Sequence, residues 1–150
     1  MELKEQKFGI EIEMTGITRA KAAEVTAEYF GTRVKYLGTY YDTYAAIDTE
    51  GRQWKFMSDG SITAQKKSNG RKINAGREYQ TEMVSPICRY EDIVTIQEII
   101  KNNDTHYDGL TILSNQLNIS PTIYLNFYFK QYLKGRSLEE ICNDILSVYE

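Results

Sequence analysis

The sequence predicts an α+β fold: a mostly antiparallel β-sheet with two helices on one face and a C-terminal β-β-α extension. Three observations lead to this prediction. Apolar and polar residues alternate over short segments, as in half-buried strands. Two segments repeat apolar residues at helical spacing, and turn residues separate the segments. The chain has 150 residues, of which 41% are hydrophobic, so it is long enough for one ordinary globular domain.

The first strand and the first helix have clear local signals. Between residues 6 and 14, apolar side chains occupy every second position, which predicts a strand with glutamates on its other face. Thr18 is the expected N-cap of a helix that runs to about residue 29, and Gly31 is its expected end. Later strands are expected at residues 34–39, 44–48, 53–58 and 77–84.

Turns and a second helix complete the first part of the chain. Asp59-Gly60 and Asn69-Gly70 are strong turn signals, and isoleucines at helical spacing predict a helix over residues 90–102. Beyond residue 103 the composition changes, which predicts two parts, residues 1–103 and a short module of residues 104–150 that packs on the first. In this module we expect a short strand at residues 110–113, a turn at 118–121, a second short strand at 122–127 and a last helix at 137–148.

Charge and composition exclude several classes of protein. The net charge of −3 argues against a general electrostatic grip on nucleic acid. No apolar run reaches the length of a membrane span, and the first residues lack a signal peptide, so we expect a cytoplasmic protein. Cys88 and Cys142 are expected to be reduced thiols. His106 is the single histidine and is expected in a surface loop.

One stretch is locally basic, since no acidic residue lies between positions 65 and 77. Its cationic residues are Lys66, Lys67, Arg71, Lys72 and Arg77. Two interpretations remain open: a solvated hairpin loop, or a docking patch for a phosphate or an acidic partner. Twelve tyrosines, among them the neighbours Tyr40 and Tyr41, also allow two interpretations, half-buried sheet residues or a protein-binding face.

Paired carboxylates are the strongest candidates for chemistry. Glu11 and Glu13 are two residues apart, so both point to one face of their strand, and Glu78, Gln80 and Glu82 do the same on a later strand. If the strands are neighbours, the carboxylates crowd together and repel unless a cation such as Mg²⁺ neutralises them. The alternative is an ordinary solvated face of an antiparallel sheet.

Three segments in order resemble the amidoligase family, which contains carboxylate–amine ligases related in fold to glutamine synthetase. The segments are residues 8–13 (FGIEIE), Trp54 with Asp59-Gly60-Ser61, and residues 82–86 (EMVSP). The resemblance covers about residues 6–102. It implies that Glu11, Glu13 and Glu82 bind Mg²⁺ and ATP, and that residues 59–61 lie near the substrate.

The chain departs from this family after the second helix. The family continues into a strand with a His-x-His pair, which this sequence lacks, and few basic residues follow: Lys130, Lys134 and Arg136. Phosphoryl transfer depends on cations that stabilise the transferred charge. Residues 106–150 instead resemble a bacterial domain family without an assigned activity. The sequence therefore predicts a chimera, a truncated ligase joined to a fragment of another family.

From these observations we expect a non-catalytic protein-binding module without a cofactor. The specific hypothesis is an anti-CRISPR-like inhibitor from a phage or mobile element that binds a host nuclease or CRISPR effector, and neither a membrane nor nucleic acid directly. The expected partner contacts are Lys66, Lys67, Arg71, Lys72, Glu78, Tyr40 and Tyr41. The alternative is an ATP- and Mg²⁺-dependent amidoligase, or a residual nucleotide- or metal-binding protein, that uses Glu11, Glu13 and Glu82.

Overall fold

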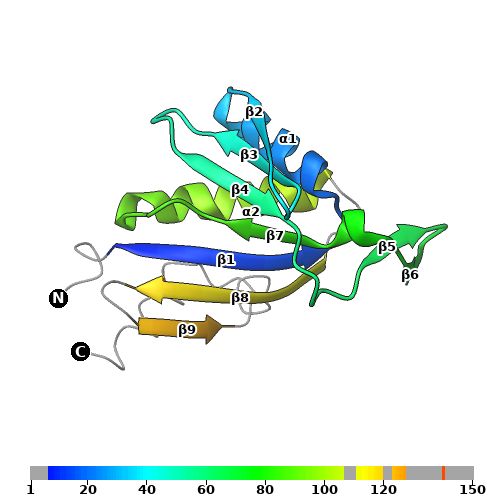
Figure 1. The fold of residues 1–150 in the computed structure, drawn as a ribbon. Coiled ribbons are helices and arrows are strands. Elements are labelled where there is room, and N and C mark those ends of the chain that lie inside the picture. The colour runs from blue at the N-terminus through cyan, green and yellow to red at the C-terminus, as the bar shows by residue number, and fades with distance from the viewer. Residues whose placement is uncertain (1–6, 107–110, 120–122, 128–139, 141–150) are drawn as a thin grey trace.

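A computed structural model describes residues 7–106, 111–119, 123–127 and 140 (Figure 1). Seven strands form one sheet in the order β2-β3-β4-β7-β1-β8-β9, and every neighbouring pair is antiparallel. Their bounds are β1 (Phe8–Thr15), β2 (Val34–Gly38), β3 (Thr43–Ile47), β4 (Gln53–Met57), β7 (Thr81–Val84), β8 (Thr111–Ile119) and β9 (Ile123–Phe127). The predicted α+β class with a mostly antiparallel sheet is confirmed.

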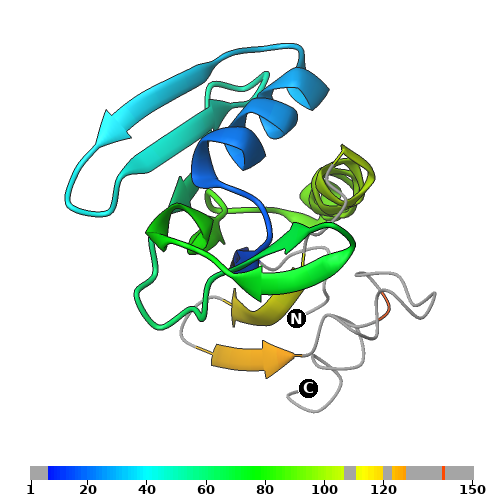
Figure 2. The same cartoon turned by 90° about the vertical axis from the view of Figure 1, so that its right-hand side faces the viewer.

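Two helices cover one face of this sheet. The α-helix α1 (Arg19–Phe30) follows β1, and α2 (Ile93–His106) follows a short 3₁₀ turn, η3 (Tyr90–Asp92). Both helices lie on the same side of the strands (Figure 2). Their buried residues belong to one core with the inward residues of β1, β4 and β7, such as Ile12, Phe56 and Met83. Within the described part of the chain, no helix is long and apolar enough to cross a membrane.

Local signals set the bounds of α1 as predicted. The Thr18 side chain accepts a hydrogen bond from the backbone N–H of Lys21, which caps the first turn. Gly31 adopts the left-handed conformation with φ of 70°, and the next N–H, of Thr32, donates to the carbonyl of Ala27. This pair of features is the Schellman motif, which favours glycine because a Cβ is strained at positive φ.

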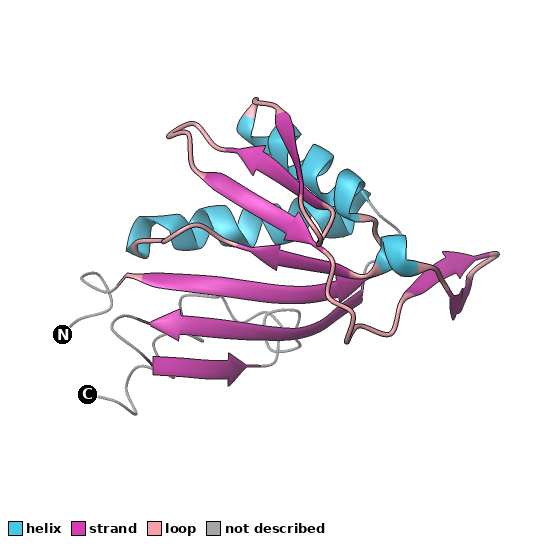
Figure 3. Ribbon diagram, viewed as in Figure 1, coloured by secondary structure: helices cyan, strands magenta, loops and turns pink. Residues whose placement is uncertain are grey.

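A second, two-stranded sheet projects from the body next to η2 (Arg77–Tyr79) (Figure 3). Its strands, β5 (Gln65–Ser68) and β6 (Arg71–Asn74), are joined by Asn69 and Gly70, whose φ angles are 50° and 76°. Positive φ at both residues is the geometry of a type I′ turn, which suits a two-residue hairpin. The predicted turn at Asn69-Gly70 is therefore confirmed, and we call the two strands that it joins the β5–β6 hairpin.

The predicted strand over residues 77–84 is half wrong. Only Thr81–Val84 pairs as a strand, whereas Arg77–Tyr79 forms the 3₁₀ turn η2. The reason is tertiary: the carbonyls of Arg77 and Gln80 accept hydrogen bonds from the Arg19 guanidinium, and the carbonyl of Tyr79 accepts one from the Thr15 hydroxyl. These bonds hold the backbone away from the sheet ladder. Glu78 consequently does not share a strand face with Glu82.

The later part of the chain also differs in its boundaries. The helix expected to end at residue 102 continues to His106, so this histidine ends a helix and does not lie in a loop. The short strand expected at 110–113 is the start of the nine-residue β8, because β1 offers a complete edge for pairing. The turn expected at 118–121 is wrong at its first two residues, because Asn118 and Ile119 belong to β8. The remaining turn residues and the last helix expected over 137–148 lie outside the described residues, apart from Glu140.

Candidate functional site

The glutamates of β1 and β7 meet on the sheet face that is turned away from the helices, which we call the carboxylate face. Alternation along β1 buries Ile10, Ile12 and Met14 among the helices and places Glu11 and Glu13 on the other side. In the register of the sheet, Glu13 is opposite Glu82 of β7. Directly opposite residues point to the same face, so the structure brings together all three predicted carboxylates.

A fourth carboxylate, Asp59, joins them from the turn after β4. Its Oδ1 accepts hydrogen bonds from the backbone N–H and the hydroxyl of Ser61, at 2.9 and 2.7 Å, which fix the side chain. Glu13, Asp59 and Glu82 each offer an oxygen, and these oxygens all lie within 4.8 Å of one another. With Glu11 they form what we call the carboxylate cluster. The amidoligase resemblance implied that residues 59–61 lie near the substrate, whereas the approach of Asp59 to Glu82 follows from the pairing of β4 with β7, which the sequence alone did not show.

The charges in this cluster disturb one another. The pKa of Glu82 is raised to about 7, first because the side chain is half-buried and then because of the negative charges of Glu11, Asp59 and Glu13. A side-chain hydrogen bond with Glu11 raises the pKa of Glu82 further. A bound cation would offset the repulsion between the carboxylates. Three hard oxygen donors from separate elements fit the coordination that Mg²⁺ prefers.

A pocket of about 700 Å³ opens beside the cluster. Its lining combines acidic, cationic, amide and phenol groups: Tyr40, Tyr41, Met57, Ser58, Asp59, Gly60, Arg77, Gln80 and Glu82. Asp59 and Glu82 belong to both the cluster and the pocket, so a cation at the cluster would lie in the pocket wall. Arg77 contributes the positive charge to the same cavity.

Two walls of this pocket are joined by one buried side chain. Arg19 is 5% exposed and donates to the carboxylate of Asp42, at 2.9 Å, and to the carbonyls of Arg77 and Gln80, at 2.9 and 2.7 Å. The pKa of Asp42 is lowered by a hydrogen bond from the Tyr36 hydroxyl and by Arg19. Arg19 therefore ties the β2–β3 turn, which carries Tyr40 and Tyr41, to the segment that carries Arg77.

The two tyrosines of the β2–β3 turn are unusually exposed. Tyr40 is 82% and Tyr41 52% exposed, and their rings contact each other edge to face with centroids 5.4 Å apart. The Arg77 guanidinium lies 5.9 Å from the Tyr40 ring. Positive φ angles at Thr39 and Asp42 bend the chain sharply on both sides of the pair. Exposed aromatic rings at a pocket rim are suited to stacking on a planar ligand or to contact with another protein.

A family model described as putative amidoligase enzyme matches residues 4–110. The chain belongs to this family. A second model, of a family of unknown function, matches residues 77–150, so the two matches overlap across β7 and α2. No curated protein and no solved structure matches the chain. The two-part resemblance seen in the sequence is confirmed, although the second match begins at residue 77 and not at 106. The division at residue 103 stays a prediction.

The amidoligase segments converge on one site. The FGIEIE segment supplies Glu11 and Glu13, the segment around residues 59–61 supplies Asp59, and EMVSP supplies Glu82. The same segments also hold the backbone together, because Ser85 accepts a hydrogen bond from the N–H of Ile10 at 2.9 Å. The basic residues expected to contact a partner lie elsewhere, on the β5–β6 hairpin, and Glu78 is exposed on η2.

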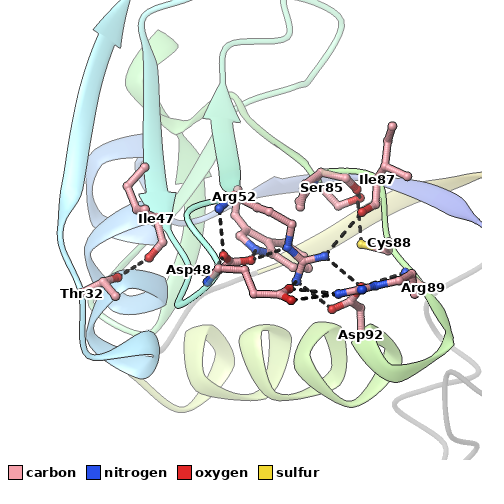
Figure 4. A network of polar contacts seen from close by, with 12 residues as sticks. Thr32, Ile47, Asp48, Arg52, Ser85, Ile87, Cys88, Arg89 and Asp92 are labelled. Atoms are coloured by element: carbon pink, nitrogen blue, oxygen red, sulfur yellow. Dashed lines mark hydrogen bonds and ion pairs between the residues drawn. The ribbon is translucent and has the colours of Figure 1, made fainter.

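Trp54, the remaining amidoligase residue singled out from the sequence, is structural, because it bonds to Asp48 of the polar network in which Figure 4 labels Asp48, Arg52 and Asp92. It is fully buried, and its indole N–H donates to the carboxylate of Asp48 at 3.0 Å. Arg52 donates to Asp48 at 2.9 Å and to both oxygens of Asp92, at 2.8 and 2.9 Å. Together these bonds fix the turn after β3 to η3. Sequence reasoning missed this network because its members are far apart in the chain.

Proposed function

We propose that this amidoligase-family protein binds Mg²⁺ at the carboxylate cluster and, through the metal, a nucleotide phosphate in the adjacent pocket. The observation that carries the proposal is the convergence of Glu13, Asp59 and Glu82, with oxygens within 4.8 Å of one another, in the wall of a cavity. Mg²⁺ is commonly held by one or two carboxylates together with substrate phosphates and water. The family resemblance independently implies that Glu11, Glu13 and Glu82 bind Mg²⁺ and ATP.

The pocket has the features that a nucleotide needs. Its volume of about 700 Å³ falls in the usual range for small-molecule sites. Tyr40 and Tyr41 offer aromatic surface for a base, and Arg77 offers a guanidinium for a phosphate. Among the described residues, Arg77 is the cationic side chain that lines this pocket. Ligase turnover would need further cations at the transferred phosphoryl group, so the proposal is limited to binding.

Direct metal titration tests the proposal. We expect Mn²⁺, used as a paramagnetic substitute for Mg²⁺, to bind with one strong site by electron paramagnetic resonance, and added Mg²⁺ to displace it. Glu82→Gln should weaken binding at least tenfold, since it removes one charged ligand. Glu24→Gln on the exposed side of α1 is the matched control and should leave binding unchanged. Equal Mn²⁺ affinity in wild type and Glu82→Gln would contradict the proposed site.

The nucleotide part has its own experiment. We expect ATP to bind in the presence of Mg²⁺ by isothermal titration calorimetry, and Arg77→Ala to reduce ATP affinity while leaving Mn²⁺ affinity intact. ATP binding that is unchanged by a chelator would show that the nucleotide does not depend on the metal.

A protein-binding function is the second candidate, favoured by the exposed tyrosine pair. Tyrosine is enriched at interface hot spots, and Tyr40 is 82% exposed. In its specific form the protein inhibits a CRISPR effector or another host nuclease, with the carboxylate face imitating nucleic-acid phosphates. Purified effector and protein should then form a complex by gel filtration that Glu11→Lys with Glu13→Lys abolishes without unfolding. Undiminished effector cleavage in the presence of excess protein would exclude inhibition.

A further inference from the structure

The β5–β6 hairpin is anchored to the main sheet at its base. Its base is tied to the end of β1 by three hydrogen bonds: Gly16 N–H donates to the Gln65 carbonyl, and the Gln65 N–H and carbonyl both bond the Thr15 hydroxyl. The Lys66 ammonium lies 5.9 Å from the Tyr79 ring, which adds a contact with η2. Beyond this base the hairpin extends away from the main sheet (Figures 1 and 3).

The outer edge of β6 carries backbone groups that face outward. Ala75 N–H donates to the Ala64 carbonyl, and pairing alternates from there along the hairpin, so Lys72 and Asn74 turn their N–H and C=O groups away from β5. Within the described residues these groups have no hydrogen-bond partner. The equivalent edge of β5 is occupied at Gln65 by the bonds to β1. Of the two strands of this hairpin, both within the described residues, β6 is therefore the one whose edge is open to another strand.

The side chains of the hairpin define which strand would fit. All four residues of β6 are exposed, including the apolar Ile73 at 42%. Lys67 is directly opposite Lys72, so one face of the hairpin carries two ammonium groups, while Ile73 and Arg71 point to the other face. No acidic residue occurs between positions 65 and 77. Such an edge repels a second copy of itself and attracts an acidic strand.

We propose that the β5–β6 hairpin binds an extended acidic polypeptide segment, which adds to the outer edge of β6 as a third strand. Main-chain hydrogen bonds to Lys72 and Asn74 supply affinity, as in other cases of strand addition, and the cationic side chains select glutamate or aspartate at alternate positions. The free backbone edge and Ile73 favour a polypeptide over nucleic acid, which would use the charges alone. This inference does not depend on metal or nucleotide binding.

A designed peptide tests the charge requirement. The probe is a fluorescein-labelled peptide of eight residues that alternates glutamate with valine, so that its glutamates lie beside Lys72 and its valines beside Ile73. By fluorescence anisotropy at low salt we expect saturable binding that Arg71→Glu with Lys72→Glu weakens at least tenfold. Arg33→Glu with Lys35→Glu, at exposed positions near β2, makes the same change in net charge and should leave binding unchanged.

Two further comparisons test strand addition itself. A peptide with proline in place of every valine keeps its charges but cannot pair as a strand, and it should bind at least tenfold more weakly. Asn74→Pro removes one outward N–H from β6 and should weaken binding severalfold, whereas Asn74→Ala should not. Circular dichroism confirms that each variant is folded.

Three results would overturn the inference. Equal affinity for the proline-containing peptide would mean that charge alone is recognised. Stronger binding of single-stranded oligothymidylate of equal charge would identify nucleic acid as the partner. Self-association by analytical ultracentrifugation that Arg71→Glu with Lys72→Glu removes would show that the edge pairs with a second copy of the chain.

Discussion

Glu82 is the residue whose ionisation depends most clearly on the fold. Its side chain is half-buried and faces three other carboxylates, so its pKa of about 7 lies far above the usual value of 4.5. The carboxylates repel one another because the strand register places Glu82 opposite Glu13. A shift of β7 by one residue would turn the Glu82 side chain into the core and remove it from the carboxylate cluster. A site that is costly without a cation is a good indicator of cation binding.

This pKa gives a prediction for stability without metal. Because the folded protein holds a proton on Glu82 more tightly than the unfolded chain does, stability should fall as pH rises from about 4.5 to 7. After allowance for solvent screening, the loss attributable to Glu82 is on the order of 1–2 kcal/mol. Urea denaturation at several pH values in a chelator should show this slope in wild type.

Glu82→Gln provides the comparison, since the amide does not titrate. The slope between pH 4.5 and 7 should be smaller in Glu82→Gln, and Mg²⁺ should restore stability at pH 7.5 in wild type only. Parallel pH profiles for the two proteins would show that Glu82 titrates normally.

Arg52 is the second residue with a testable role. It is the common partner of Asp48 and Asp92, whose side chains are 4% and 8% exposed. Arg52→Ala leaves two buried carboxylates without their guanidinium, and we expect a loss of about 3 kcal/mol in the free energy of unfolding. Chemical denaturation measures it. Arg89→Ala, which removes an exposed ion pair with Glu50, is the control and should change stability little.

Among the elements, α1 shows how local signals determine a boundary. Gly31 ends this helix with a φ of 70°, so Gly31→Ala forces a Cβ into a strained backbone conformation although the space is empty. We expect a loss of about 1 kcal/mol in the free energy of unfolding. Gly9→Ala on β1 also meets nothing within 4 Å and has no positive φ, so thermal unfolding should show little change.

The sequence predicts features that depend on neighbouring residues and misses those that depend on distant ones. The bounds of α1, the alternation of β1 and the Asn69-Gly70 turn depend on neighbouring residues, and all three were predicted. The 3₁₀ turn at Arg77–Tyr79 depends on Arg19, about sixty residues away, and was predicted as strand. Its misassignment also put Glu78 on the wrong face. Asp59 was recognised as a turn residue, but its approach to Glu82 follows from strand pairing that no local pattern records.

For the whole molecule, the central place of β1 matters most. It pairs with β7 on one side and with β8 on the other, over eight register positions. The amidoligase match ends at residue 110, immediately before β8, and the second family's match includes β8 and β9. The strands that complete the sheet beside β1, β8 and β9, thus lie in the part of the chain that the second family model matches and the amidoligase model does not.

Removal of residues 107–150 tests whether the first part is an independent domain. The deletion takes away β8 and β9 and leaves the long edge of β1, with its alternating isoleucines, unpaired. We expect aggregation or marked loss of stability, seen by gel filtration and thermal unfolding. A monomeric deletion variant with a cooperative unfolding transition would instead support the predicted division near residue 103.

The hydrogen bonds around the pocket join residues that are far apart in the sequence, and this has a consequence for the order of folding. Arg19 reaches residues about sixty positions away, Thr15 reaches residues 50 and 64 positions away, and Ile10 reaches Ser85 across 75 positions. Contacts between such distant segments carry a large loop-closure cost and slow the folding of a chain. Neither the cation ligands nor the pocket walls are assembled until the whole stretch from β1 to β7 has folded. Ligand binding would therefore report on completed folding, and a newly synthesised chain acquires the site only after β7 has left the ribosome.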